Sequence, residues 1–514
     1  MNTPAEGREG LSVAQAAQLY TTMSAARQTV LDRARKASSL TIPGLIPEEG
    51  QNEHSSFEQP YQSLGARCVS NLSSALLLAL FPPNLPFFRL AVDEQTAAEL
   101  GEDLGTVNGQ LAILARTIYG LMEGAQLRPA MIEAIRHLVV AGNVLLYAPE
   151  KGASRLFRLD QFVIRRDAMG VPMTIVVRER VYPSALDESV RTAAGLTATG
   201  SETEMVDVYT VIRREKDRMV WQQEVKDVVI PGSNGSAPVD ASPWIALRWL
   251  SVPGSDYGRS HVTEYIGDFL SLEDLYKSMV QFAAVASRII FGVDPNSSTD
   301  IDELAEAQTG DFVHFRKDTV HTLQLDKYAD WQVMADLAER LEQRLAAAFL
   351  LRTGVTRDAE RVTAEEVRLV AQELENILGG TYTILSAELQ LPLTRRFMQI
   401  GVRLNRVPEL PKTVVPTVVT GFDALGRAHG TNRLRAWIAD LQAAGIDVKT
   451  ELNTEELSRR LGDGHGVDGL DALIKTAEQK AQEAQEQQSA MALQGAVPQI
   501  AKSAGEAVMN QETQ

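Results

Sequence analysis

Three arginines, Arg352, Arg357 and Arg361, are the group of side chains in this sequence best placed to do chemistry. Guanidinium groups bind phosphate oxygens through paired hydrogen bonds, so a basic loop of this kind could touch a nucleic-acid backbone. Within a single subunit the same arginines could instead pair with Asp358 and Glu360 in a solvated loop. In a closed ring the loop would repeat around the axis and form an annulus of positive charge. The role of the cluster therefore depends on oligomerisation.

The other patterns that could carry chemistry are weak. Gly464, Gly466 and Gly469 match a dinucleotide-binding spacing, but the segment before them is predicted to be a charged helix instead of the required strand. His314 and His321 are seven residues apart, and the segment offers no obvious further metal ligands. No glycine is followed by lysine, so the phosphate-binding loop of ATP-driven motors is absent. We expect no catalytic site, no metal and no cofactor.

A long helix is predicted directly after the arginines. Thr363 and Glu366 have capping-box spacing, so each side chain can bond a free backbone N–H at the start of the helix. Apolar residues then recur with helical period over 367–378. The pair Gly379 and Gly380 interrupts this pattern before it resumes, which predicts a bend in one continuous helix. The arginines are thereby placed at the mouth of a bent helix.

Composition indicates a globular chain with more than one domain. It has 514 residues, 44% of them hydrophobic, and a formal net charge of −17 at pH 7. So acidic a chain is not expected to grip nucleic acid over a broad face, because phosphates must be neutralised by Lys and Arg. Cys68 is the single cysteine, which excludes an intrachain disulfide and fits a reducing compartment. The apolar run Leu76–Phe81 is too short for a membrane span, and the N-terminus lacks signal-peptide order.

Helices open the chain, and a mainly β region follows them. From Asn143 to about Leu250, short β-branched and aromatic runs alternate with turn residues, which predicts a small sheet or barrel embedded in helices. The fold class is therefore mainly α with a smaller β portion, an α+β protein. Apolar periodicity and breakers predict the opening helices over 11–39, 61–81, 97–121 and 129–141.

Two long helices are predicted to flank a compact insertion. The first covers Gly258–Ile290, with Ser260 near its start, and the second covers Ala329–Leu351. The insertion, Phe291–Tyr328, contains Gly, Pro and Asn and two histidines. Further along, Pro392, Pro408 and Pro411 are expected to break the helical pattern. From about residue 472 the composition narrows to Ala, Gln and Glu, which predicts a solvated helix that fades into a disordered tail.

Ten short blocks of this sequence, in this order, resemble a known family. They resemble the head-to-tail connector, or portal, protein of short-tailed bacteriophages of the autographivirus kind, over roughly Tyr20 to Arg427. The sequence just upstream of Glu360 departs from the family pattern, as does the chain after about Ala428. The blocks are Ser63–Arg67, Asn71–Leu72, Ala79–Pro82, Leu138–Tyr147, Arg165–Ala168, Tyr257–Ser260, Glu264–Asp268, Ala307–Val313, Glu360–Glu366 and Leu385–Leu393.

The resemblance implies a viral portal fold that assembles as a ring. In that frame Arg352, Arg357 and Arg361 would lie in a DNA-channel tunnel loop, Thr363 and Glu366 would cap the next helix, and Gly379 and Gly380 would bend it. The implied parts are a wing over 1–257 with its β region at 143–250, a first stem helix over 258–290, a clip over 291–328, a second stem helix over 329–351, a tunnel loop over 352–362, a bent wing-to-crown helix over 363–405, a crown over 406–471 and a tail over 472–514.

The function that the resemblance implies is structural and not enzymatic. A ring, expected to be a dodecamer, would sit at one capsid vertex, where the genome is packaged and ejected. Expected partners are the terminase large subunit, a tail adaptor protein at the clip, major capsid and scaffolding proteins, internal core proteins at the crown, and double-stranded DNA that passes non-specifically. No membrane is expected; assembly would occur in the host cytoplasm and the product would reside in the virion. The alternative is a structural ring or tube adaptor with no role as a DNA duct.

Overall fold

The computed structural model describes most of the chain up to residue 418 and a few residues beyond it. Two compact units, Met1–Phe422 and Asp423–Gln514, can be distinguished; in the second, residues 437–443 are helical. The elements below belong to the first unit. The described residues are 15–51, 55–82, 86–100, 104–196, 204–286, 290–297, 299–314, 317–323, 328–351, 378, 384–411, 413–418, 434, 437–445, 457, 458 and 461.

Five helices form the first part of the unit, as the sequence predicts except between residues 94 and 124. They are α1 (Ala16–Leu40), α2 (Leu64–Leu80), α3 (Glu94–Leu100), α4 (Leu104–Gly124) and α5 (Leu127–Ala141). The predicted helix over 97–121 corresponds to α3 and α4, and it begins too late. The Asp93 carboxylate accepts a hydrogen bond from the Thr96 backbone N–H at 2.8 Å, so Asp93 caps α3 and starts it at Glu94.

The predicted β region contains two antiparallel sheets. One is six-stranded and the other has the strand order β10-β2-β3. Apolar residues of β2 and β10 are buried on both faces of the smaller sheet. One face shares a core with α2 and α5, and the other shares a core with the six-stranded sheet. The middle residues of β5 and β6 are buried as well. The strands are β2 (Asn143–Tyr147), β3 (Arg155–Phe157), β4 (Phe162–Arg166), β5 (Pro172–Val181), β6 (Val206–Glu215), β7 (Arg218–Val225), β8 (Val228–Val229), β9 (Gly235–Pro238) and β10 (Trp244–Arg248), with the short helix α6 (Glu188–Ala193) and the 3₁₀ turns η2 (Pro183–Ala185) and η3 (Val239–Ala241) between them.

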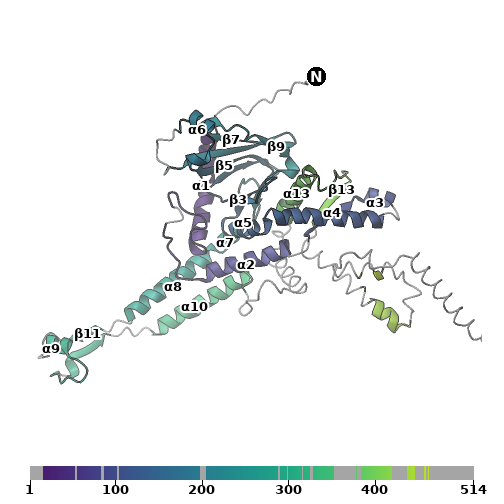
Figure 1. The fold of residues 1–514 in the computed structure, drawn as a ribbon. Helices are drawn as coiled ribbons and strands as arrows, with labels where there is room; N and C mark the ends of the chain where they lie inside the picture. The colour runs from purple at the N-terminus through teal and green to yellow at the C-terminus, as the bar shows by residue number, and fades with distance from the viewer. Residues whose placement is uncertain are drawn as a thin grey trace, which may run out of the picture. The chain divides into compact units, whose positions relative to one another are not determined.

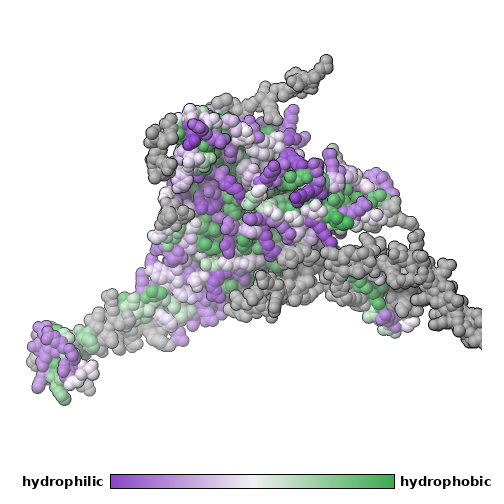
Figure 2. Space-filling model, viewed as in Figure 1, coloured by the Kyte–Doolittle hydropathy of each residue, from purple (hydrophilic) through white to green (hydrophobic). Residues whose placement is uncertain are grey.

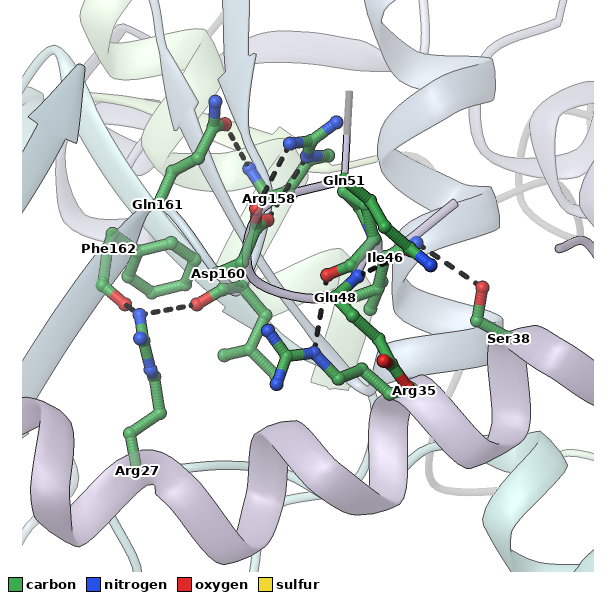
Figure 3. A network of polar contacts seen from close by, with 12 residues as sticks. Arg27, Arg35, Ser38, Ile46, Glu48, Gln51, Arg158, Asp160, Gln161 and Phe162 are labelled. Atoms are coloured by element: carbon green, nitrogen blue, oxygen red, sulfur yellow. Dashed lines mark hydrogen bonds and ion pairs between the residues drawn. The ribbon is translucent and has the colours of Figure 1, made fainter. Parts of the chain in front are cut away.

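A buried arginine fastens α1 to the six-stranded sheet (Figure 3). Arg27 is 4% exposed, and its Nη1 donates to the carbonyl oxygens of Leu159 at 2.8 Å and Phe162 at 2.7 Å. It also lies 3.2 Å from the Tyr20 hydroxyl oxygen. Among the described residues, the hydrogen-bond acceptors of the buried Arg27 charge are two backbone carbonyls and the Tyr20 hydroxyl, and none is a carboxylate. The network fixes the helix on the sheet.

Burial of a histidine on α5 predicts a pH-dependent stability. His137 is 4% exposed, and burial together with the nearby Arg158 lowers its pKa to about 4. The unfolded chain takes up a proton below its ordinary pKa of about 6.5, whereas the folded chain does not, so stability is complete above that pH and falls as pH drops toward 4. We expect the thermal midpoint to fall by a few degrees more between pH 6.5 and 4.5 than in a His137→Gln variant. Parallel midpoint curves for the two proteins would contradict this.

A tight crossing of backbone precedes the long helices. Gly142 has φ of +75°, and a Cβ built on it would lie 2.6 Å from the Ser260 nitrogen. The Asn143 side chain accepts from the Gly258 N–H at 2.7 Å and donates to the Gly258 carbonyl at 2.9 Å. Only glycine at 142 permits this approach, which fixes the start of the helices that follow.

The long helices differ from their predicted bounds. Ser260 caps α7 (His261–Glu264), with its hydroxyl accepting from the Thr263 N–H at 3.0 Å, and Tyr265 then separates α7 from α8 (Ile266–Ala286). Ile290, predicted as the end of the first helix, instead begins β11 (Ile290–Val293), because its backbone pairs with β12 (Val320–Leu323). The short helix α9 (Ile301–Glu306) and the 3₁₀ turn η4 (Lys317–Thr319) lie between these strands. The second long helix is α10 (Tyr328–Ala348).

Pro392 does not interrupt its helix, contrary to the prediction. The π-helical turn η6 (Ser386–Gln390) runs directly into α13 (Leu391–Arg403), and the Leu391 N–H bonds the Ser386 carbonyl five residues back. A widened turn before the proline accommodates its ring and its missing N–H. Beyond α13, β13 (Val414–Val418) pairs antiparallel with β1 (Phe88–Val92).

Candidate functional site: the helix pair and the start of the arginine loop

The arginines, the helix-capping residues and the glycines that the sequence singles out lie outside the part of the chain that the structure describes. The structure does describe helices α8 and α10, here called the helix pair, and it describes the chain as far as Leu351. Leu351 directly precedes Arg352, the first residue of the segment 352–361 that we call the arginine loop. The geometry that holds the start of the loop is therefore defined. The predicted residues outside the described ranges are Arg352, Arg357, Arg361, Thr363, Glu366, Gly379 and Gly380, together with Gly464, Gly466 and Gly469.

Helices α8 and α10 run side by side, with α9 and β11 at the far end of the pair (Figure 1). Near the body of the protein, Phe269 and Leu272 of α8 and Leu345 of α10 are completely buried. They belong to the same hydrophobic core as α2 and α5. Burial of this apolar surface holds the pair to the body as one packed element.

Polar contacts tie the pair together at its surface. Arg344 Nη2 lies 2.6 Å from the Asp268 carboxylate, and the Tyr276 hydroxyl donates to the Glu342 carboxylate. That hydrogen bond, with a smaller contribution from burial, raises the pKa of Tyr276 to about 12. Glu273 of α8 accepts from the Tyr61 backbone N–H at 2.8 Å. These contacts fix the two helices relative to each other and to the segment before α2.

Removal of the Tyr276 hydroxyl should weaken the pair slightly. Tyr276→Phe keeps the ring and removes one hydrogen bond at a partly exposed site, so we expect a loss of at most about 1 kcal/mol of unfolding free energy. Differential scanning calorimetry of the variant measures it. Tyr182→Phe is the matched control, because Tyr182 is 47% exposed and lies between β5 and η2, outside the helix pair. Equal midpoints for the two variants would show that the Tyr276–Glu342 contact does not stabilise the pair.

Helix α10 ends at Ala348, three residues before its predicted end, in a tight reverse turn. The Leu351 N–H bonds the Ala346 carbonyl at 2.8 Å, and the Leu350 N–H bonds the Ala347 carbonyl at 3.3 Å. This is the hydrogen-bond pattern of a Schellman motif. The residue in the left-handed conformation is Leu350, with φ of +55°, where glycine is usual. Surrounding contacts must therefore hold this strained turn in place.

Two side chains from the body hold the carbonyls that the helix end leaves free. The Asn71 Nδ2 of α2 donates to the Leu350 carbonyl at 2.7 Å and to the Phe349 carbonyl at 3.2 Å. The His261 Nε2 of α7 lies 3.1 Å from the Ala348 carbonyl. A carbonyl only accepts, so this nitrogen must carry the proton. We call Asn71 and His261 the loop clamp, because they bind the last three residues before Leu351.

Aromatic packing reinforces the loop clamp. The Phe349 ring centroid lies 4.7 Å from that of His261 and 5.6 Å from that of Phe269, both edge-on. Burial lowers the pKa of His261, opposed in part by the hydrogen bond to the Ala348 carbonyl. The ring is therefore neutral at physiological pH and acts as a fixed donor. What the site can do is position a loop; the described residues carry no nucleophile or paired acid and base there.

Sequence reasoning did not identify the loop clamp. Asn71 could have been noticed as a polar residue among the buried positions Cys68 and Leu72 of an apolar helix. Its partner Leu350 is 279 residues away, and no pattern in one sequence shows such a contact. His261 directly follows Ser260, which was predicted to lie near a helix start, but carries no signal of its own.

Alternative chemistries find no support in the described residues. They contain no group of three or more His, Cys, Asp or Glu side chains able to hold a metal ion. His314 and His321 are both described and belong to no such group. Burial raises the pKa of the Cys68 thiol to about 12, so it is not a nucleophile at neutral pH. Of the helices described, none has the length and apolar character needed to cross a membrane.

Comparison with known proteins identifies the family. The family model for bacteriophage head to tail connecting protein matches residues 13–470. The portal protein of Escherichia phage T7 is 37% identical over 97% of this chain and 95% of its own length, and that of Enterobacteria phage T3 is 39% identical over 92% and 90%. A chain from the solved virion of a native gene transfer agent particle aligns with 12% identity over 85% of this chain and 93% of its own, at a TM-score of 0.39. The chain belongs to the family of bacteriophage head to tail connecting proteins.

Proposed function

We propose that this chain is the portal protein of a bacteriophage, a ring at one capsid vertex through which the genome is packaged and later ejected. The observation that carries the proposal is the near full-length similarity to the T7 and T3 portal proteins. A family match over most of the chain supports it. The role is structural: the protein supplies a duct and docking surfaces and catalyses no reaction.

The parts of the portal are assigned by their order along the chain. Helices α8 and α10 would be the stem, and the segment between them the clip. The wing would comprise residues 1–257, the first stem helix would begin at residue 258, and the crown and tail would follow residue 405. The tunnel loop would begin at Arg352, immediately beyond the loop clamp, and bring Arg352, Arg357 and Arg361 to the channel. Thr363 and Glu366 would then cap the helix that Gly379 and Gly380 bend.

Surface composition of the stem pair supports assembly into a ring. Toward the clip, Val280 and Val285 of α8 and Val333 and Leu337 of α10 are between 48% and 68% exposed. Figure 2 shows hydrophobic side chains at the surface of this part of the protein. A neighbouring subunit would cover them, as expected for a closed ring whose interface is repeated around the axis. We propose a dodecamer.

The negative net charge of the chain suits a duct through which DNA slides. A chain of net charge −17 would repel DNA along most of the wall, so the polymer could slide, while a few arginine rings would touch its phosphates briefly. We propose the terminase large subunit and a tail adaptor as partners at the clip, capsid and scaffolding proteins around the wing, and internal core proteins at the crown. The ring would assemble in the host cytoplasm and reside at the portal vertex of the virion.

Negative-stain microscopy of the purified chain, with rotational averaging, tests the assembly. We expect closed rings with a central channel and twelvefold symmetry. A monodisperse monomer at micromolar concentration would contradict ring assembly, and a ring with an occluded centre would contradict a DNA duct.

A further inference from the structure

A cavity of about 600 Å³ lies between one face of α5 and two segments that pack against that helix. Its lining residues from α5, together with Gln126 just before the helix, recur at helical spacing between 126 and 137, so the cavity follows the helix for about 16 Å. The opposite wall comes from Gly44 and Leu45 and from the stretch 154–161, which includes β3. A cavity of this volume is large enough for a small-molecule ligand.

Positive charge predominates in the lining of this cavity. Three arginines, Arg136, Arg155 and Arg158, line it, against one carboxylate, that of Glu133. The chain as a whole has a net charge of −17, so the lining has the opposite charge balance to the rest of the protein. Guanidinium groups bind oxyanions through paired, charge-assisted hydrogen bonds. The cavity is therefore suited to a negatively charged ligand.

Two of the three arginines are held in place by carboxylates outside the lining. Arg158 donates from Nε and Nη2 to the two carboxylate oxygens of Asp160, at 3.1 and 3.0 Å (Figure 3). Arg155 Nη2 lies 2.6 Å from the Glu179 carboxylate, and its guanidinium lies over the Phe157 ring, 5.3 Å from the centroid. These contacts neutralise part of the charge but fix both guanidinium groups, so little freedom is lost when their remaining N–H groups bind a ligand.

Arg136, the third arginine, has no acidic partner. Its guanidinium forms no hydrogen bond with the described residues, although its Nε is buried. The Ser154 Oγ and the His137 Nδ1 are also buried without a hydrogen-bond partner among those residues, and the two side chains are 9% and 4% exposed. Buried polar groups are nearly always paired, with protein, water or a ligand. Three unpaired ones in a single lining indicate that the cavity takes a polar occupant.

We propose that this cavity binds a phosphate group, supplied either by free inorganic phosphate or by a nucleoside monophosphate, with Arg136 as its main charge partner. Arg155 and Arg158 would add N–H groups that their own carboxylates leave open. A phosphate group fits better than a carboxylate, because it carries up to two charges and has at least three acceptor oxygens for donors on several walls. Bound phosphate would join α5 to the stretch 154–158. The inference goes beyond the proposed portal function and does not depend on it.

The size of the occupant separates a small ligand from two larger ones. A neighbouring subunit and duplex DNA could each bring a negatively charged group to the opening of the cavity. The unpaired atoms of Arg136, His137 and Ser154 are buried, however, so they favour an occupant that enters the cavity over a surface that covers it. The experiment below includes both alternatives as outcomes.

The experiment measures binding to the purified full-length chain by isothermal titration calorimetry at constant ionic strength. The titrants are inorganic phosphate, deoxyadenosine monophosphate and a short DNA duplex with unphosphorylated ends. Arg136→Gln is compared with wild type and with Arg89→Gln, a matched control because Arg89 is exposed on β1. We expect wild type and control to bind phosphate or the nucleotide with a Kd of about 1 mM or lower, and Arg136→Gln to bind at least about tenfold more weakly. Tighter binding of the nucleotide than of phosphate would identify the nucleotide as the source.

Glu133→Gln provides a second variant that does not depend on the folding of Arg136→Gln. Glu133 is exposed, and its replacement removes the only carboxylate of the lining. We expect it to tighten phosphate binding by about twofold or more, because a like charge beside the ligand is removed. Glu123→Gln, at an exposed position of α4, is the matched control and should bind as wild type does.

Four outcomes would overturn the phosphate site. The first is a wild-type chain that binds neither phosphate nor the nucleotide. The second is binding that changes in neither Arg136→Gln nor Glu133→Gln. Tighter binding of the duplex, lost in Arg136→Gln, would make the lining a DNA contact instead. Loss of rings in Arg136→Gln, with rings intact in Arg89→Gln, would mean that a neighbouring subunit fills the cavity.

Discussion

Phage particles built with Asn71→Leu should assemble rings but package at least about tenfold less DNA than wild type. Leucine keeps the branching of asparagine at Cγ and is larger, but it donates no hydrogen bonds to the carbonyls of Phe349 and Leu350, which are 3.2 and 2.7 Å from Asn71 Nδ2. Each carbonyl left unpaired in a partly buried site costs about 1–3 kcal/mol. The left-handed turn at Leu350 then loses its support, and the start of the arginine loop can shift. Quantitative measurement of packaged DNA in a complementation assay gives the result.

Asn108→Leu is the matched control for Asn71→Leu, because Asn108 is exposed on α4 and the substitution is identical. The control should package as wild type does. If Asn71→Leu lowers protein yield, His261→Gln offers a second route, since glutamine retains a donor but removes the ring that packs on Phe349. Normal packaging by both Asn71→Leu and His261→Gln, with rings present, would mean that the loop clamp does not position a functional loop.

The second large effect is expected from Arg357→Ala combined with Arg361→Ala. In a ring these residues would repeat around the channel, so the double change removes two positive charges per subunit from the proposed contact with phosphate. Rings should form normally, whereas DNA retention in filled heads, or packaging yield, should fall about tenfold. Centrifugation of particles after packaging, with quantitation of retained DNA, distinguishes leakage from slow filling.

Arg33→Ala combined with Lys36→Ala is the charge-matched control, since both residues are exposed on α1. It removes the same number of positive charges from a part of the chain outside the proposed channel. If the loop variant retains and packages as much DNA as wild type, the arginine loop has no valve role. An equal loss of DNA in the loop variant and the control would instead reflect net charge alone.

Much of the fold could be predicted because its signals are local. Apolar periodicity and breakers located α1, α2 and α5 within a few residues, and short β-branched and aromatic runs located the β region that contains β2 to β10. Ser260 was predicted near a helix start and does cap α7. These features depend on neighbouring residues, which a sequence displays directly.

The structure differs from the sequence-based predictions where contacts between distant residues, or an unusual backbone conformation, override the local conformational preference of a residue. Leu350 adopts φ of +55° because Asn71 and the Schellman bonds hold it there, whereas its side chain alone would favour a continuing helix. Pro392 follows a π turn that no composition signals, and Ile290 leaves the helical pattern because β12 pairs with it. The loop clamp joins residues from three separate segments, so it emerges only in the folded chain.

The central claim, that this chain is the duct for the genome, is tested most directly by DNA packaging into heads made with and without it. Purified heads, terminase and ATP are supplied in both reactions, and DNA protected from nuclease is measured. The portal function predicts protected DNA with the wild-type chain and essentially none in its absence. Equal protection of DNA in heads that lack the chain would contradict it and would leave a structural adaptor, with no passage for DNA, as the better description.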